Sequence, residues 1–232
     1  DSDEQRRQLP GSLDTTTAGI KAAGARALAV PMDLHDHATL ATSVDRVLGQ
    51  WGRIDLLVNN AVDTGPGSMT RFLDTPLEAF AAKLDANVLA PVALIKLVLP
   101  GMLGRGAGTI VNVTSAVAIT DPASPAGEGG WGSAYAMSKG AFHRLAAILA
   151  VELTDRGVLA FNVEPGYVVT EKMEINQREL GLEGRYPGAP PSVPASVIAW
   201  LATDAEAPTL NGQTISAQRF ARERGLHPAW KR

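Results

Sequence analysis

The feature that most limits the fold of this sequence is the alternation of short apolar segments with longer amphipathic ones. Strands alternating with helices are typical of a parallel sheet covered by helices on both faces. With 232 residues and neither an internal repeat nor a linker, the sequence predicts an α/β fold, a doubly wound parallel sheet, in one domain covering residues 1–232. The predicted strands are 26–34, 54–61, 108–115, 158–166 and 212–217, and the predicted helices are 13–24, 36–52, 76–103, 135–156 and 192–204.

Polar or turn-forming residues end several of the predicted strands. In a doubly wound sheet, ligands bind beyond the carboxyl ends of the strands. We therefore expect the ligand-binding and catalytic residues to lie at this one edge of the sheet. The residues at the strand ends are Asp33, Asn59–Asn60, Thr114–Ser115 and Glu164–Pro165–Gly166.

Tyr135 and Lys139 lie one turn apart on an otherwise apolar stripe of their predicted helix. A lysine in such a place costs free energy unless its ammonium reaches water or is paired. One interpretation is that Lys139 simply reaches water. The other is that it lies beneath the polar end of the Tyr135 ring and lowers the pKa of the phenol, which would make Tyr135 an acid or base near neutral pH. The stripe comprises Tyr135, Lys139, Phe142, Ala146, Leu149 and Leu153.

The same helix has a second apolar zone, which predicts a further contact. A helix that is apolar on two sides is buried on both. We expect the second zone to pack against another subunit, in a homodimer or homotetramer. Its residues are Met137, Ala141, Leu145, Ile148 and Val151.

Pro91 falls well inside the predicted helix 76–103. It has no amide hydrogen, so the carbonyl of Asn87, four residues earlier, loses its helical partner. Either the helix is merely kinked, or Asn87 holds a water in a proton path to Lys139.

Composition excludes several classes of function. The net charge is −3 without a basic block, so we expect no nucleic-acid partner, and the absence of cysteine rules out disulfides and thiol chemistry. The longest apolar run, 88–100, contains Lys96 and is too short to span a bilayer. With no signal-like start, we expect a cytoplasmic protein without a membrane partner. His35 and His37 suggest a solvated loop, and we expect no metal site.

Five motifs in order carry a resemblance to a known family. They are "NNA" at 59–61, Asn87 in "NVLAP", Ser115 ending "IVNVTS", "YAMSK" at 135–139 and "PGYVVT" at 165–170. Together the sequence resembles the short-chain dehydrogenase/reductase family over nearly its whole length. The resemblance implies a Rossmann-like three-layer αβα fold and an NAD(P)-dependent oxidoreductase that interconverts a secondary alcohol and a ketone. A non-catalytic subunit or scaffold of the same descent is the alternative, and an epimerase or dehydratase is a third.

The resemblance also implies roles for four catalytic residues. Tyr135 would be the general acid/base, and Lys139 would lower its pKa and bind the nicotinamide ribose. Ser115 would hydrogen-bond the substrate oxygen, and Asn87 would hold the relay water.

Further residues would contact NAD or NADP. Asp33 would meet the adenine amine, although it is also a plausible turn former, and the backbone of Asn60 and Ala61 would line the adenosine. Pro165 and Gly166 would lie beside the nicotinamide, with Val168 and Thr170 at its carboxamide. We expect Asn59 to tie neighbouring strands together and His143 to be structural.

The sequence also departs from the family. The first strand–helix–strand unit with its glycine-rich turn is absent, so we expect roughly 30 or more residues upstream in the parent protein. The missing strands would lie between 26–34 and 54–61, and without them two strand edges are unpaired. The choice between NAD and NADP cannot be read. An insertion at 116–133 carries Trp131, a candidate substrate contact, and the usual glycine pair after the last strand is lacking.

Overall fold

The fold is built on a parallel sheet of four strands in the order β1-β2-β3-β4. The computed structural model describes residues 11–171, 173–175 and 188–230. The strands are β1 (Leu56–Asn59), β2 (Gly108–Val113), β3 (Val158–Glu164) and β4 (Thr214–Ser216). Because all four run in the same direction, their carboxyl ends meet at one edge, as the sequence predicts.

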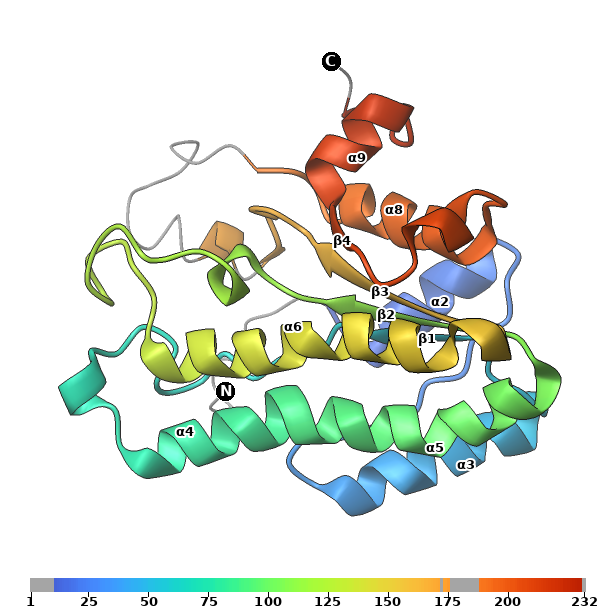
Figure 1. Ribbon diagram of the computed structural model, residues 1–232, viewed down its shortest axis with the longest axis horizontal. Helices are drawn as coiled ribbons and strands as arrows, with labels where there is room; N and C mark the ends of the chain where they lie inside the picture. The colour runs from blue at the N-terminus through green and yellow to red at the C-terminus, as the bar shows by residue number, and fades with distance from the viewer. Residues whose placement is uncertain (1–10, 172, 176–187, 231–232) are drawn as a thin grey trace.

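Helices cover both faces of the sheet, which confirms the three-layer α/β fold (Figure 1). On one face α3 (His37–Trp51), α5 (Ala90–Arg105) and α6 (Ser133–Leu153) enclose an apolar core against Ile110 and Ala160. On the other, α8 (Ser192–Thr203) and α9 (Ala217–Arg224) pack on Val111 and Phe161. Residues 110 and 111, and likewise 160 and 161, point to opposite faces because side chains alternate along a strand.

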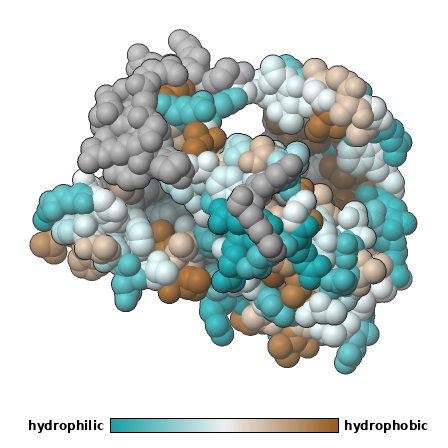
Figure 2. Space-filling view, turned by 90° about the horizontal axis from the view of Figure 1, so that it is seen from above, coloured by the Kyte–Doolittle hydropathy of each residue, from teal (hydrophilic) through white to brown (hydrophobic). Residues whose placement is uncertain are grey.

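The short elements complete the described chain. α2 (Leu13–Ala22) buries none of its residues. Short 3-10 turns span η1 (Phe72–Asp74), η3 (Ala116–Ala118), η4 (Thr154–Arg156) and η5 (Ala207–Leu210). Seen from the side of α8 and α9, hydrophobic residues are scattered among hydrophilic ones and form no single continuous patch (Figure 2).

A single long helix runs through α4 (Leu77–Leu84), a π-helical turn η2 (Asp85–Leu89) and α5. The π turn ends two residues before Pro91 and contains Asn87, so the chain adapts to the proline by widening one turn. π turns inside helices are common at functional sites.

This helix, Leu77–Arg105, is long and apolar enough to cross a membrane by length and composition alone. The apolar run 88–100, by itself too short to span a bilayer, is only part of this helix. A core helix passes the same test, and 44% of its most apolar window is buried inside the protein. The helix is therefore weak evidence for a membrane, and the absence of a membrane partner stays a prediction.

The strand predicted at 26–34 is wrong, because this segment has no regular secondary structure. A strand needs a neighbour for its backbone groups, and in the described part of the chain β1 pairs only with β2. Residues 27–30 are half-buried without pairing. The side chains of β1 before Asn59 are likewise only partly buried, as expected for an edge strand.

Candidate active site

Tyr135 and Ser115 meet at the carboxyl edge of the sheet. Ser115 lies just beyond β2, and Tyr135 is the third residue of α6. The Ser115 side chain lies near enough to the Tyr135 phenol to act on its pKa. Burial raises the pKa of Tyr135 above its ordinary value, and the influence of Ser115 offsets only part of that rise. Desolvation of the phenolate dominates in this structure, and Lys139 is not among the groups that shift the pKa of Tyr135. A lowering of that pKa by Lys139 stays a prediction.

Lys139 is buried and does not reach water. Its side chain is on the same stripe as Tyr135, the residue is 4% exposed, and its Nζ donates to the Val113 carbonyl at 3.0 Å. Burial lowers its pKa from 10.5 to about 8. The ring of Phe142, 5.4 Å from Nζ, adds a cation–π contact. An ammonium has three donors, so the bond to Val113 leaves this cation capacity to bind further oxygens.

The side chain of Asn87 is engaged by protein groups. Its Nδ2 donates to Ser138 Oγ at 3.0 Å and to the Asp63 carbonyl at 3.3 Å, and its Oδ1 accepts from the Asp63 amide at 2.7 Å. Ser138 Oγ in turn donates to the Tyr135 carbonyl at 2.8 Å. Asn87 therefore links the loop after β1 to the first turn of α6. A water on its backbone carbonyl stays a prediction.

A buried ion pair that the sequence reasoning missed lies beside Asn87. Lys83 is 0% exposed, and its Nζ is 2.9 Å from Asp63 Oδ2. Burial acts to raise the pKa of Asp63, but the amide of Gly65 and the charges of Lys83 and His35 outweigh it, so the pKa is lowered. The sequence spacing could have indicated that Lys83 lies near the site, because Lys83 precedes Asn87 by four residues and so shares its helix face.

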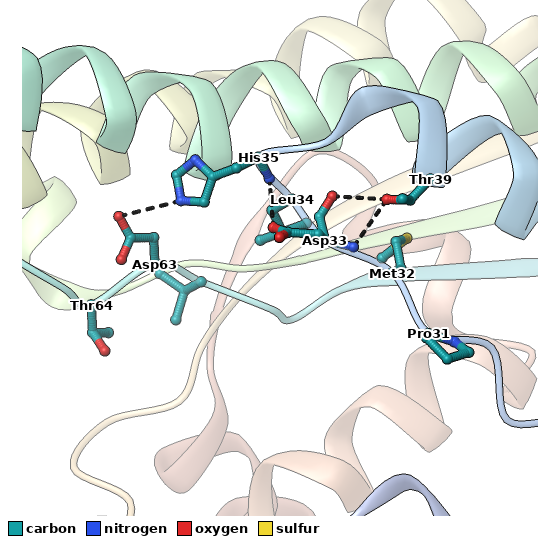
Figure 3. Close-up of a pocket in the computed structure, with 9 residues that line it drawn as sticks. Pro31, Met32, Asp33, Leu34, His35, Thr39, Asp63 and Thr64 are labelled. Atoms are coloured by element: carbon teal, nitrogen blue, oxygen red, sulfur yellow. Dashed lines mark hydrogen bonds and ion pairs between the residues drawn. The ribbon is translucent and has the colours of Figure 1, made fainter. Parts of the chain in front are cut away.

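Asp33 and His35 line a hollow of about 470 Å³ between the 31–35 segment and the loop after β1 (Figure 3). Asp33 Oδ1 accepts from the His35 amide at 2.9 Å, which makes it a turn former here. The His35 ring points toward Asp63, at 3.8 Å (Figure 3). Asn60 and Ala61, in the loop after β1, are exposed.

The rings of His35 and His37 lie close to carboxylates. His37 Nε2 is 3.1 Å and His35 Nδ1 is 3.8 Å from the carboxylate of Asp85. Among the residues that the structure describes, no group of three or more potential ligands could hold a metal ion. Both rings are exposed enough to be partly solvated.

The segment after β3 turns sharply at Gly166. Gly166 has φ +70°, and its amide donates to Glu164 Oε1 at 2.7 Å. Val168 forms a parallel bridge with Ala189. Thr170 is exposed, and its Oγ1 accepts from the Met173 amide at 3.3 Å. Residues 172 and 176–187, between β3 and α8, lie outside the described residues.

Two structural roles expected from the sequence are confirmed. Asn59 Nδ2 donates to Asn112 Oδ1 at 2.9 Å and so joins β1 to β2. The His143 ring lies between the hydroxyls of Thr114 and Thr214, at 3.1 and 3.2 Å, and bridges the ends of β2 and β4.

Trp131 lines a different hollow, of about 700 Å³, together with Phe72, Pro125 and Met137. Met137 lies two residues after Tyr135, about 200° around the helix. Neither Tyr135 nor Ser115 lines this hollow. The structure therefore gives no support to Trp131 as a substrate contact.

Comparison with known proteins defines the class of protein to which this site belongs. The short chain dehydrogenase family model matches residues 8–180. An uncharacterized oxidoreductase of Methylorubrum extorquens is 33% identical over 88% of this chain and 80% of its own length. A 3-oxoacyl-[acyl-carrier-protein] reductase of Synechocystis is 32% identical over 90% of this chain and 81% of its own. Other curated relatives are matched over as little as 49% of their length.

The fold comparison agrees. The crystal structure of a putative short-chain dehydrogenase/reductase from Burkholderia xenovorans superposes with a TM-score of 0.74, at 26% identity, over 91% of this chain and 81% of that one. The chain belongs to the short-chain dehydrogenase family. It is an oxidoreductase that uses NAD or NADP, with the choice between them open.

The residues present fit the nicotinamide side of such a cofactor. The buried Lys139 ammonium has donors beyond the one that Val113 accepts, and the turn at Gly166 opens the backbone beside the same edge. The described residues contain no glycine-rich turn between a strand and a helix of the kind that holds a pyrophosphate.

Proposed function

We propose that this protein interconverts a secondary alcohol and a ketone, with Tyr135 as general acid/base. The observation that carries the proposal is the meeting of the Tyr135 and Ser115 side chains at the carboxyl edge of the sheet, with the buried ammonium of Lys139 one helical turn away. The nicotinamide of NAD or NADP would accept or supply the hydride.

Each residue of the chain would have a separate task. Tyr135, whose pKa is raised, is a neutral phenol near pH 7 and so holds a proton for a carbonyl oxygen. Ser115 would hydrogen-bond the same oxygen and stabilise its developing charge. Lys139 would bind the ribose hydroxyls and favour the phenolate when Tyr135 gives up its proton. Asn87 would hold the relay water on its backbone carbonyl.

The cofactor contacts are proposed on the same edge of the sheet. Asp33 would face the adenine, and the backbone of Asn60 and Ala61 the adenosine; the hollow between Asp33 and Asp63 supports that assignment. Pro165, Gly166, Val168 and Thr170 would line the nicotinamide.

The test is replacement of Tyr135 with Phe in the full-length protein. Turnover of ketones with NADH or NADPH should fall by about 10²- to 10⁴-fold, while cofactor affinity and thermal unfolding stay close to wild type. Thr203→Ala, which removes a surface hydroxyl on α8 bonded to the Ala199 carbonyl at 2.9 Å, is the control. Undiminished turnover by Tyr135→Phe would refute the mechanism.

A scaffold without catalysis is the second candidate, favoured by the lack of a glycine-rich turn in the described chain. A fluorescence titration with NADH and NADPH separates the two functions. Cofactor binding by the full-length wild type supports the enzyme, and no binding to either supports the scaffold.

We further propose that the protein forms a homodimer or homotetramer through α6. Met137, Ile148 and Val151 are exposed on this helix, Val151 by 87%. Leu89 and Leu97, on the long helix 77–105, are exposed as well. Patches of large exposed apolar side chains are typical of protein interfaces. A cytoplasmic location and the absence of a nucleic-acid partner stay predictions of the sequence.

A further inference from the structure

Gln218, in the first turn of α9, holds the turn that follows β3. α9 begins directly after β4, the strand next to β3. The Nε2 of Gln218 donates to the carbonyl of Pro165 at 3.0 Å and to the carbonyl of Tyr167 at 2.8 Å. The side-chain amide of Gln218 is thus hydrogen-bonded to the backbone on both sides of Gly166.

Gly166 and the amide of Gln218 are fitted to each other. Gly166 has φ +70°, a conformation that residues with a Cβ rarely adopt. A Cβ at this position would lie 2.4 Å from Gln218 Nε2. The absence of a side chain at residue 166 is therefore what lets the amide approach both carbonyls.

The helix that carries Gln218 is firmly anchored. Ala217 and Ala221 are fully buried against the core beneath α8. Trp230 Nε1 donates to the Gln218 carbonyl at 3.0 Å. Arg224 pairs with Glu206 at 2.6 Å. These contacts hold α9 in place, so the Gln218 amide can restrain the turn to which it is hydrogen-bonded.

The turn it holds lies beside the catalytic residues. Val163 in β3 is the register partner of Val113 in β2. Two residues beyond each partner come Pro165 and Ser115, so a shift of the turn would change the space beside the Ser115–Tyr135 pair. The Tyr167 carbonyl also accepts from the Ala189 amide at 3.0 Å, which makes the Pro165 carbonyl the more dependent of the two on Gln218.

We propose that Gln218 is a positioning residue that sets the affinity for the nicotinamide cofactor by fixing the Pro165–Gly166–Tyr167 backbone. This inference rests on the proposed function, in which that turn lines the nicotinamide. The Gln218 amide joins the C-terminal helix α9 to the turn after β3.

The test compares two substitutions of similar length in the full-length protein. Gln218→Glu replaces the donor with an acceptor facing two carbonyls, and Gln218→Met removes the donor without adding charge. We expect the dissociation constant for NADH or NADPH to rise about tenfold or more in the first and about threefold in the second. Gln213→Glu is the control, because Gln213 Nε2 bonds the Thr209 carbonyl at 3.4 Å, away from the turn.

Thermal unfolding of each variant separates positioning from general stability. Weaker cofactor binding by Gln218→Met at an unchanged melting temperature supports the proposal, even if Gln218→Glu fails to fold. Wild-type affinity in both Gln218 variants overturns it, and so does an equal loss in Gln213→Glu. If the wild type itself binds neither cofactor, the proposed function fails and this inference fails with it.

Discussion

Replacing Lys139 with Met should stabilise the fold while it removes activity. The fall in the pKa of Lys139 from 10.5 to about 8 corresponds to about 3 kcal/mol of unfavourable free energy for the charged form in the folded chain. The variant also loses the 3.0 Å hydrogen bond to the Val113 carbonyl. This loss costs about 1–2 kcal/mol of stability and offsets part of the gain from removing the buried charge. A net gain of about 1–2 kcal/mol in the free energy of unfolding is expected at pH 7.

The sign of the pH dependence follows from the direction of the shift. Below about pH 8 the ammonium is charged in both the folded and the unfolded chain, so the full cost is present. Between about 8 and 10.5 the folded chain loses its proton first, and wild-type stability rises relative to the variant. The advantage of Lys139→Met should therefore shrink as the pH is raised through this window.

Urea unfolding at pH 7 and pH 10 measures both effects. Lys96→Met is the matched control, because Lys96 is exposed on α5. The control should change stability by a few tenths of a kcal/mol, equally at both pH values. The reasoning fails if Lys139→Met is less stable than wild type at pH 7 by a margin that does not change with pH.

Two further substitutions test the ion pair and the proposed interface. Asp63→Asn leaves the buried ammonium of Lys83 without a carboxylate. Urea unfolding at pH 7 should show a loss of about 3 kcal/mol, against little change in the exposed control Asp45→Asn. Because the pKa of Asp63 is lowered, this contribution is present above pH 3.8 and disappears as the pH falls through the folded-state pKa; a difference that persists there would contradict the pairing. Ile148→Asp places a charge on the α6 stripe, where Ile148 is 45% exposed, and should convert the oligomer to a monomer in sedimentation, whereas Leu13→Asp on α2 should not. A wild type that is already monomeric would end the interface proposal.

Local patterns identified most of the elements that build the site. The runs that form β2 and β3 are recognisable in the sequence because each is mostly apolar and begins at or just after a glycine. Such runs are typical of strands that are buried on both faces. The stripe on α6 correctly placed Lys139 against the core. The role of Asn59 in tying neighbouring strands together was predicted, whereas its partner Asn112 follows from the register of β1 and β2 in the structure.

Other features depended on neighbours that no local pattern names. The apolar segment 26–34 has the composition of a strand, yet a strand forms only where a second backbone offers donors and acceptors. The sequence predicts that Lys139 lowers the pKa of Tyr135, whereas in the structure burial of the phenol raises it and Ser115 opposes the rise only in part. At Pro91 the sequence suggests either a kink or a water held by Asn87, and neither alternative names the π turn that the structure has there.

By itself, the sequence determined which residue types stand at the carboxyl ends of the strands and on each face of the helices, because strand and helix periodicity are local. Only the tertiary structure decided which of those groups touch. Asp63 meets Lys83 across 20 positions and Gln218 meets Pro165 across 53. Contacts of this kind depend on how the chain returns on itself, and the charge, burial and hydrogen bonding of each group follow from that path.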